Sequence, residues 1–162
     1  MKYIYDHRID CDYVCYFNGN LQYNLNYDTS LNKIDLSKLN VSRHVGSNPN
    51  SQYDNKLFTN IDQKSQAYIE HNYKYIHSGL FIGPSDIVYE MCKDVYNMCE
   101  IDLMKNIIPR YHDESYLNKW VQLNLDKVAP PIKLISYKKF EKDKPFAVIE
   151  TIKKDRTAKW RL

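Results

Sequence analysis

The sequence predicts an α/β fold in a single domain, residues 1–162, and three observations support this. Two runs rich in β-branched and aromatic residues, 12–17 and 75–83, are typical of strands. The second run leads into residues 84–99, where apolar side chains recur at helical spacing. The length is close to that of one ordinary domain, ~100–150 residues. Strands followed by helices indicate a sheet that binds ligands at the carboxyl ends of its strands.

The first half of the chain contains one clear strand and a long irregular stretch. The strand at 12–17 is expected to be buried, and it runs into the turn signal Asn18-Gly19-Asn20. Residues 21–65 are polar, rich in asparagine and weakly periodic, with one short apolar patch at 39–41. This stretch is interpreted either as a binding loop or as loose surface.

Two helices and two later strands are expected in the second half. The first helix opens at Pro84-Ser85. Its apolar stripe is interpreted as core and consists of Ile87, Val88, Met91, Cys92, Val95, Met98 and Cys99. The second helix has Asp113 as a candidate cap. Its expected apolar face comprises Leu117, Trp120, Val121 and Leu123. Residues 132–136 and 146–149 are further strand candidates.

Composition excludes several classes of protein. The 23 basic and 20 acidic residues leave a net charge of +3, too small an excess to suggest a nucleic-acid partner. No signal peptide and no run of ~18 apolar residues is found, so no membrane span is expected. The four cysteines form no C-x-x-C pair, and with His71 and His77 they fit no known zinc spacing. Reduced thiols in the cytoplasm are the simpler interpretation.

Four segments, in order, carry a family resemblance. Residues 111–120, YHDESYLNKW, resemble the W-H-D-E-S-x-L-N-K-Y signature of glycosyltransferase family 6, which includes the histo-blood group A/B transferases and the α1,3-galactosyltransferases. Residues 65–69, SQAYI, match the family's S-x-A-Y-I, and residues 77–83, HSGLFIG, are similar to its donor-pocket strand H-A-A-I-F-G-G. Residues 13–20 fall where the family has a strand ending in D-x-D. The resemblance implies the C-terminal part of a GT-A-like, partly Rossmann-like glycosyltransferase domain.

The resemblance implies a retaining hexosyltransferase that moves galactose or N-acetylgalactosamine from a UDP-sugar to a glycan hydroxyl in an α1,3-type linkage. Such transfer needs a carboxylate beneath the anomeric carbon, either as nucleophile or as electrostatic support. By resemblance this catalytic carboxylate is Glu114, and Asp113 accepts hydrogen bonds from hydroxyls of the donor sugar. For a bare Asp-Glu pair, the alternative is that both acids cap a helix and complement its dipole.

The other substrate contacts also follow from the resemblance. His77, Ser78 and Gly79 correspond to donor-binding positions. There Gly79 leaves space for an N-acetyl group, whereas His77 is similar to the galactose-selecting members, so both donors stay open. His44 lies where the family has a histidine that contacts the acceptor. Tyr111 replaces the family's acceptor-stacking tryptophan and keeps a smaller aromatic face.

The site requires a particular arrangement of strands. The strand that ends at Phe17 should lie next to the strand centred on Ser78-Gly79, because both must deliver their carboxyl ends to one sugar site. We also expect Asn18 and Glu114 to lie on the same face of that sheet.

Asn18 and Asn20 occupy the two D-x-D positions, where carboxylates would hold a divalent metal that neutralises the leaving diphosphate. Neutral amides are poor replacements. Some bacterial members of the family carry the same N-x-N form, and similarity to them implies transfer without a metal or other cofactor. Lys154 and Arg161 best match the family's diphosphate-contacting tail and would supply positive charge. The alternative for this basic tail is a solvated chain end.

The family's nucleotide-binding half precedes the D-x-D position, and nothing in this sequence replaces it. A separately encoded N-terminal half, a longer reading frame or a loss of catalysis would each account for this. The alternative function is therefore a non-catalytic carbohydrate-binding or relic domain that keeps the acceptor pocket without donor binding.

Overall fold

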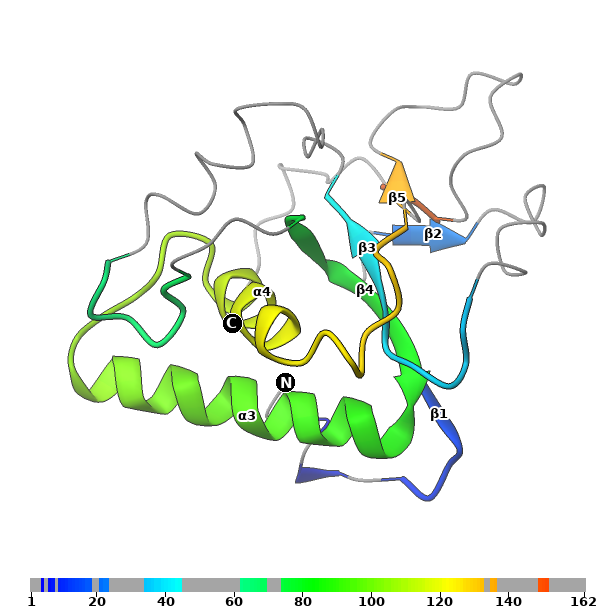
Figure 1. Ribbon diagram of the computed structural model, residues 1–162, viewed down its shortest axis with the longest axis horizontal. Helices are drawn as coiled ribbons and strands as arrows, with labels where there is room; N and C mark the ends of the chain where they lie inside the picture. Colours follow the sequence, from blue (N-terminus) through cyan, green and yellow to red (C-terminus); the bar gives the residue numbers. More distant parts are fainter. Residues whose placement is uncertain are drawn as a thin grey trace, which may run out of the picture.

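The computed structural model confirms a mixed α/β arrangement (Figure 1). It describes Ile4, residues 6–7, 9–18, 21–23, 34–44, 62–69, 74–132, 135–136 and 149–151. Its elements are β1 (Tyr13–Phe17), β2 (Leu21–Tyr23), β3 (Asn40–Arg43), β4 (Ile76–Pro84), α3 (Ser85–Met104), α4 (Asp113–Leu123), β5 (Ile135–Ser136) and β6 (Ile149–Thr151). The expected site residues Asn20, Lys154 and Arg161 lie outside the described residues.

The main sheet has the order β1-β4-β3, and both pairs are antiparallel. The expected neighbourhood of the first two strands is confirmed, since Phe17 of β1 pairs with Leu80 of β4. The expected reason is wrong, because antiparallel strands place their carboxyl ends at opposite ends of a sheet. β4 is longer than β1, so the carboxyl end of β1 lies beside the first half of β4. Asn18 continues this pairing, and its N–H donates to the Gly79 carbonyl at 2.9 Å.

β4 contains a bulge where it faces β3. The register passes from the pair Val41–Phe81 directly to the pair Ser42–His77. Three consecutive residues of β4 therefore fall outside this ladder: Ser78, Gly79 and Leu80. A bulge frees backbone groups from the ladder and redirects side chains, and such irregularities are common beside active sites.

α3 and α4 pack on the sheet through one hydrophobic core. The helix predicted to open at Pro84-Ser85 is confirmed, with Pro84 as N-cap residue and no side-chain cap. Its buried stripe meets a stacked ring pair from the sheet, Tyr16 and Phe81, whose centroids are 4.8 Å apart. Burial raises the pKa of the Cys92 thiol, in this stripe, to about 11. Cys92 is therefore a small core residue, as the sequence predicted.

Several burial predictions need correction. β1 is not buried on both faces, because Tyr13, Cys15 and Phe17 are exposed while the residues between them face the core. As a strand at the edge of the described sheet, β1 shows the alternation of a half-buried element. In α4, Leu117 and its neighbours are buried as expected, but Leu123 is 67% exposed.

The stretch 21–65 is more regular than the sequence suggested. It contains the strands β2 and β3, whereas it was interpreted as a binding loop or as loose surface. β2 belongs to a second sheet of order β2-β6-β5, in which β6 pairs antiparallel with β2 and parallel with β5. The strand expected at 132–136 corresponds to an isolated bridge from Ile132 to Ser42 followed by β5. Of the strand expected at 146–149, residues 146–148 lie outside the described part, and β6 begins at Ile149.

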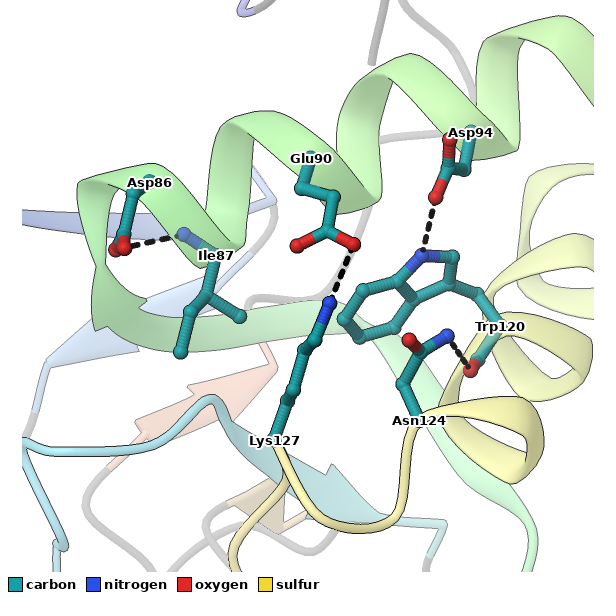
Figure 2. A network of polar contacts seen from close by, with 7 residues as sticks. All are labelled: Asp86, Ile87, Glu90, Asp94, Trp120, Asn124 and Lys127. Atoms are coloured by element: carbon teal, nitrogen blue, oxygen red, sulfur yellow. Dashed lines mark hydrogen bonds and ion pairs between the residues drawn. The ribbon is translucent and has the colours of Figure 1, made fainter.

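Polar contacts fix α4 and the turn after it to α3 (Figure 2). The Trp120 indole N–H donates to Asp94 Oδ2 at 3.0 Å, so the largest buried side chain of α4 also has its polar atom satisfied. Lys127 pairs with Glu90 of α3, and the Asn124 amide donates to the Trp120 carbonyl at 2.9 Å. The contacts of Trp120 and Lys127 hold the carboxyl end of α4 against α3, whereas the first turn of α4 contacts β4. Neither α3 nor any other helix among the described residues combines the length and the apolar character of a membrane-spanning segment.

Candidate functional site

The carboxylate of Glu114 is held by the bulge of β4. Glu114 Oε2 accepts the Ser78 backbone N–H at 2.9 Å and the Ser78 hydroxyl at 3.3 Å. This backbone N–H is available because Ser78 lies outside the β3–β4 ladder. A half-buried carboxylate that accepts two hydrogen bonds has a fixed position and orientation. The site thus begins with one oriented negative charge at the head of α4.

α4 begins differently from the prediction. Its N-cap residue is His112, not Asp113, and no side chain caps the helix. His112 has φ 48° and ψ −124°, a region that non-glycine residues rarely occupy. Asp113 and Glu114 lie in the first turn, where carboxylates complement the helix dipole. The alternative that both acids only cap the helix is therefore incomplete, since Glu114 bonds to Ser78 of another element.

Asp113 is exposed and lies beside both the sheet and an apolar pocket. Burial and then the charge of Asp113 raise the pKa of Tyr16 in β1. Asp113 also borders a pocket of about 360 Å³ lined chiefly by apolar residues of α3 and of the segment before α4. The two adjacent acids thus have different environments. Glu114 is anchored, whereas Asp113 is open to solvent.

The imidazole of His77 lies over Gly79. Its Nδ1 accepts the Gly79 N–H at 2.8 Å, so Nδ1 carries no proton and the neutral ring is protonated at Nε2. A Cβ added at Gly79 would lie 2.5 Å from His77 Cε1, 2.7 Å from Nδ1 and 3.2 Å from the Asn18 amide nitrogen. The space that the sequence assigned to Gly79 is therefore occupied by His77. Tyr16 Oη donates to Asn18 Oδ1 at 2.7 Å and orients this amide.

Charges of both signs act on His77. Burial is the main cause that lowers its pKa, and His44 lowers it further. The carboxylates of Glu114 and Asp113 act in the opposite direction and raise it. The net direction is downward, which favours the neutral ring and agrees with the acceptor role of Nδ1.

A row of rings joins the acceptor candidates to His77. His44 stacks on His77 with centroids 5.6 Å apart and an interplanar angle of 19°. Tyr75 meets His44 edge-on at 5.6 Å and Tyr111 edge-on at 6.0 Å. Tyr75 is fully buried, and burial followed by the charge of Glu114 raises its pKa. Tyr75 was missed as a site residue because a tyrosine at the start of an apolar strand carries no local functional signal.

The structure brings most of the predicted residues together along the first half of β4. The gathered residues are Asn18, His44, His77, Ser78, Gly79, Tyr111, Asp113 and Glu114. Asn18 continues β1 on the face that carries Tyr16, because side chains of a strand alternate. Tyr16 belongs to the core that α4 covers, so Asn18 and Glu114 share this face of the sheet. Within the described parts of the chain, no group of three His, Cys, Asp or Glu side chains is placed to hold a metal.

A buried carboxylate that was not predicted as a site residue stabilises α4, the helix that carries Glu114. Asp102 of α3 is 0% exposed and accepts the Ser65 hydroxyl at 2.5 Å, the Gln66 N–H at 2.9 Å and the Tyr116 hydroxyl at 3.1 Å. It therefore ties the S-Q-A-Y-I segment and α4 to the end of α3. An acid in the last turn of an amphipathic helix resembles a solvated residue, so its role becomes visible only in three dimensions.

Comparison with known families gives a match for this chain. The model of a family described as "Glycosyltransferase family 6" matches residues 48–159, more than half of the chain. The match includes β4, α3 and α4, and most of the predicted site residues. Outside it, Asn18, Asn20 and His44 precede the matched range and Arg161 follows it. No curated protein gives a significant match.

Proposed function

The chain belongs to glycosyltransferase family 6, and from this premise we propose that it is a retaining hexosyltransferase acting between a UDP-hexose and a glycan hydroxyl, with an α1,3-type product. The observation that carries the proposal is the Glu114 carboxylate, held by Ser78 at the bulge of β4 with Asp113 beside it. This family uses a nucleotide-sugar donor and a glycan acceptor.

The proposed reaction exchanges one bond at the anomeric carbon for another. The bond from the sugar C1 to the diphosphate oxygen breaks and UDP leaves with the electron pair. The acceptor oxygen then bonds to C1 on the same face, and its proton passes to the departing phosphate. Glu114 faces C1 from the opposite side, as a nucleophile in two displacements or as electrostatic support for one oxocarbenium-like transition state. The two Ser78 contacts keep the carboxylate from rotating during this change.

The proposed substrate contacts are made by the residues that lie together along the first half of β4. Asn18, His77, Ser78, Gly79 and Asp113 form the proposed donor subsite. His44 and Tyr111 form the proposed acceptor side, and the ring of Tyr75 contacts both. Outside the described residues, Asn20 is assigned to the donor subsite, and Lys154 and Arg161 to the diphosphate.

The test is the release of UDP from UDP-galactose and UDP-N-acetylgalactosamine in the presence of a galactoside acceptor. The chain is assayed by itself and with a nucleotide-binding half from the family added, so that a uridine pocket is present in one of the two assays. Acceptor-dependent UDP release supports the proposal. Acceptor binding without any release in both assays would favour a carbohydrate-binding relic.

Donor choice is expected to favour galactose because the His77 ring fills the space in front of Gly79. The substitution His77→Ala reopens this space. It should raise the ratio of kcat/KM for UDP-N-acetylgalactosamine over UDP-galactose by about 10-fold, the usual scale for a changed apolar fit. Competition between the two donors in one assay measures this ratio. The control His44→Ala removes the stacked partner and should leave the ratio unchanged. An unchanged ratio in His77→Ala would contradict this assignment.

Transfer is expected to proceed without a divalent metal. Amide oxygens lack the charge that a hard cation requires, and Oδ1 of Asn18 already accepts the Tyr16 hydroxyl. Titration calorimetry with Mn²⁺, with and without UDP, should show no binding of useful affinity, and EDTA should leave turnover unchanged. Tight binding of Mn²⁺ that Asn20→Ala abolishes would contradict this prediction.

A further inference from the structure

Asn118 connects the catalytic helix to the strand that it faces. Its side chain is 3% exposed and makes three hydrogen bonds. Oδ1 accepts the Ile76 N–H at 2.7 Å, and Nδ2 donates to the Ile76 carbonyl at 2.9 Å and to the Glu114 carbonyl at 2.8 Å. The amide thus pairs with both backbone groups of Ile76, as a neighbouring strand would, and its third bond returns to its own helix at Glu114.

The spacing of these contacts matches the helix to the strand. Glu114 and Asn118 are four residues apart in α4, which is about 6 Å of helix rise and places them on one face. Their partners, Ile76 and Ser78, are two residues apart in β4, which is about 6.6 Å of strand rise. Two side-chain acceptors of α4 therefore meet two backbone donors of β4 in register. A displacement of α4 along β4 would break both contacts together.

We propose that Asn118 is the positioning residue that holds the Glu114 carboxylate against Ser78; it acts through Glu114 and touches no substrate. The inference rests on the proposed function, because the role of Glu114 gives this position its catalytic consequence. Asn118 bonds α4 to Ile76 of β4. With the helix fixed there, the Ser78 N–H that the bulge leaves free lies within hydrogen-bond distance of Glu114. A buried, fully bonded amide is a rigid support for such a geometry.

The main test is Asn118→Leu, which keeps the branched shape of the side chain and removes all three bonds. A second variant, Asn118→Asp, still accepts the Ile76 N–H but loses both donated bonds. The matched control is Asn124→Leu. Asn124, the C-cap residue of α4, makes the same kind of amide bond to the carbonyl four residues earlier, at Trp120 (Figure 2). Unlike Asn118, its side chain makes no hydrogen bond to β4 among the described residues. Two readouts are combined, steady-state kinetics and hydrogen exchange of the Ser78 backbone amide by NMR.

Asn118→Leu should lower kcat about 10-fold or more with the donor KM within about 2-fold, since small displacements of a catalytic group cost this much. The Ser78 amide should exchange about 10-fold faster. Asn118→Asp should change both in the same direction, and Asn124→Leu should change neither. Wild-type values of kcat and of Ser78 exchange in Asn118→Leu would overturn the proposal. So would unfolding of both Asn118 variants by far-UV circular dichroism, because Asn118 would then serve the fold alone. If the wild-type chain transfers no sugar, the proposed function fails, and Ser78 exchange still decides whether Asn118 positions Glu114.

Discussion

Replacing Glu114 by glutamine is expected to lower turnover about 10²-fold or more, with little change in donor binding. Glutamine keeps the shape of the side chain, and its amide oxygen can still accept the Ser78 N–H. What it removes is the negative charge, whose interaction with the anomeric carbon is stronger in the transition state than in the ground state. The loss should therefore appear in kcat, and the donor Kd from calorimetry should stay within about 3-fold.

The neighbouring acid provides the matched comparison. Asp113 lies one residue earlier and is exposed, without the anchoring contacts of Glu114. Asp113→Asn should weaken donor binding as well as the rate, because its proposed bonds to sugar hydroxyls exist before the reaction begins. Turnover and donor hydrolysis are measured for both variants beside the wild type. Near-normal turnover in Glu114→Gln would remove this residue from the catalytic role.

The substitution Asp102→Ala should lower the free energy of unfolding by about 3 kcal/mol or more. It leaves the buried hydroxyl of Ser65, the Gln66 N–H and the Tyr116 hydroxyl without their acceptor, and each such loss costs about 1–3 kcal/mol. For a chain of this size the midpoint of thermal unfolding should fall by about 6 °C or more.

Tyr116→Phe serves as the control for Asp102 because it removes a single donor and keeps the ring in place. It should cost about 1.5–3 kcal/mol, as expected for one hydrogen bond to a charged group. Urea unfolding of both variants gives the two free energies. A loss below about 0.5 kcal/mol in Asp102→Ala would show that water satisfies these three donors as well as the carboxylate does.

The elements with strong local patterns could be predicted from the sequence. The apolar stripe after Pro84 identified α3, and the β-branched and aromatic run before Asn18 identified β1. β3 was not predicted, since its residues Asn40 and Ser42 are polar although they are almost fully buried. The Asn40 amide donates to the carbonyl of Asp35 and accepts its N–H, a pattern typical of turns.

The expectation that β1 and β4 bring their carboxyl ends to the same site was also wrong. Strands followed by helices favour parallel sheets, but β3 precedes β4 and pairs with it antiparallel. The site is therefore built around the start of β4 and its bulge, not around strand carboxyl ends. A bulge depends on two strands together, so the sequence of β4 alone gives no sign that the Ser78 N–H is released.

In the site, the sequence motif predicted which chemical groups are present but not how they contact one another. His77 and Gly79 gave opposite indications of donor size when each was considered alone, and the structure shows that the first fills the space of the second. Asn118 stands within the signature segment, yet its partner Ile76 lies 42 residues earlier in the chain. Contacts at such separations follow from the packing of α4 on β4, which no local pattern encodes.

The stereochemistry of the product tests the central claim most directly. Wild-type protein, with the nucleotide-binding half supplied, is incubated with UDP-galactose and a galactoside acceptor, and the coupling of the new anomeric proton is recorded by ¹H NMR. A small coupling, about 3–4 Hz, denotes an α-linked sugar and retention, which the anchored Glu114 carboxylate predicts. The same measurement on Glu114→Gln should show the same anomer at a much lower rate. A β-linked product with the large coupling of inversion would contradict the proposal that Glu114 supports retaining transfer.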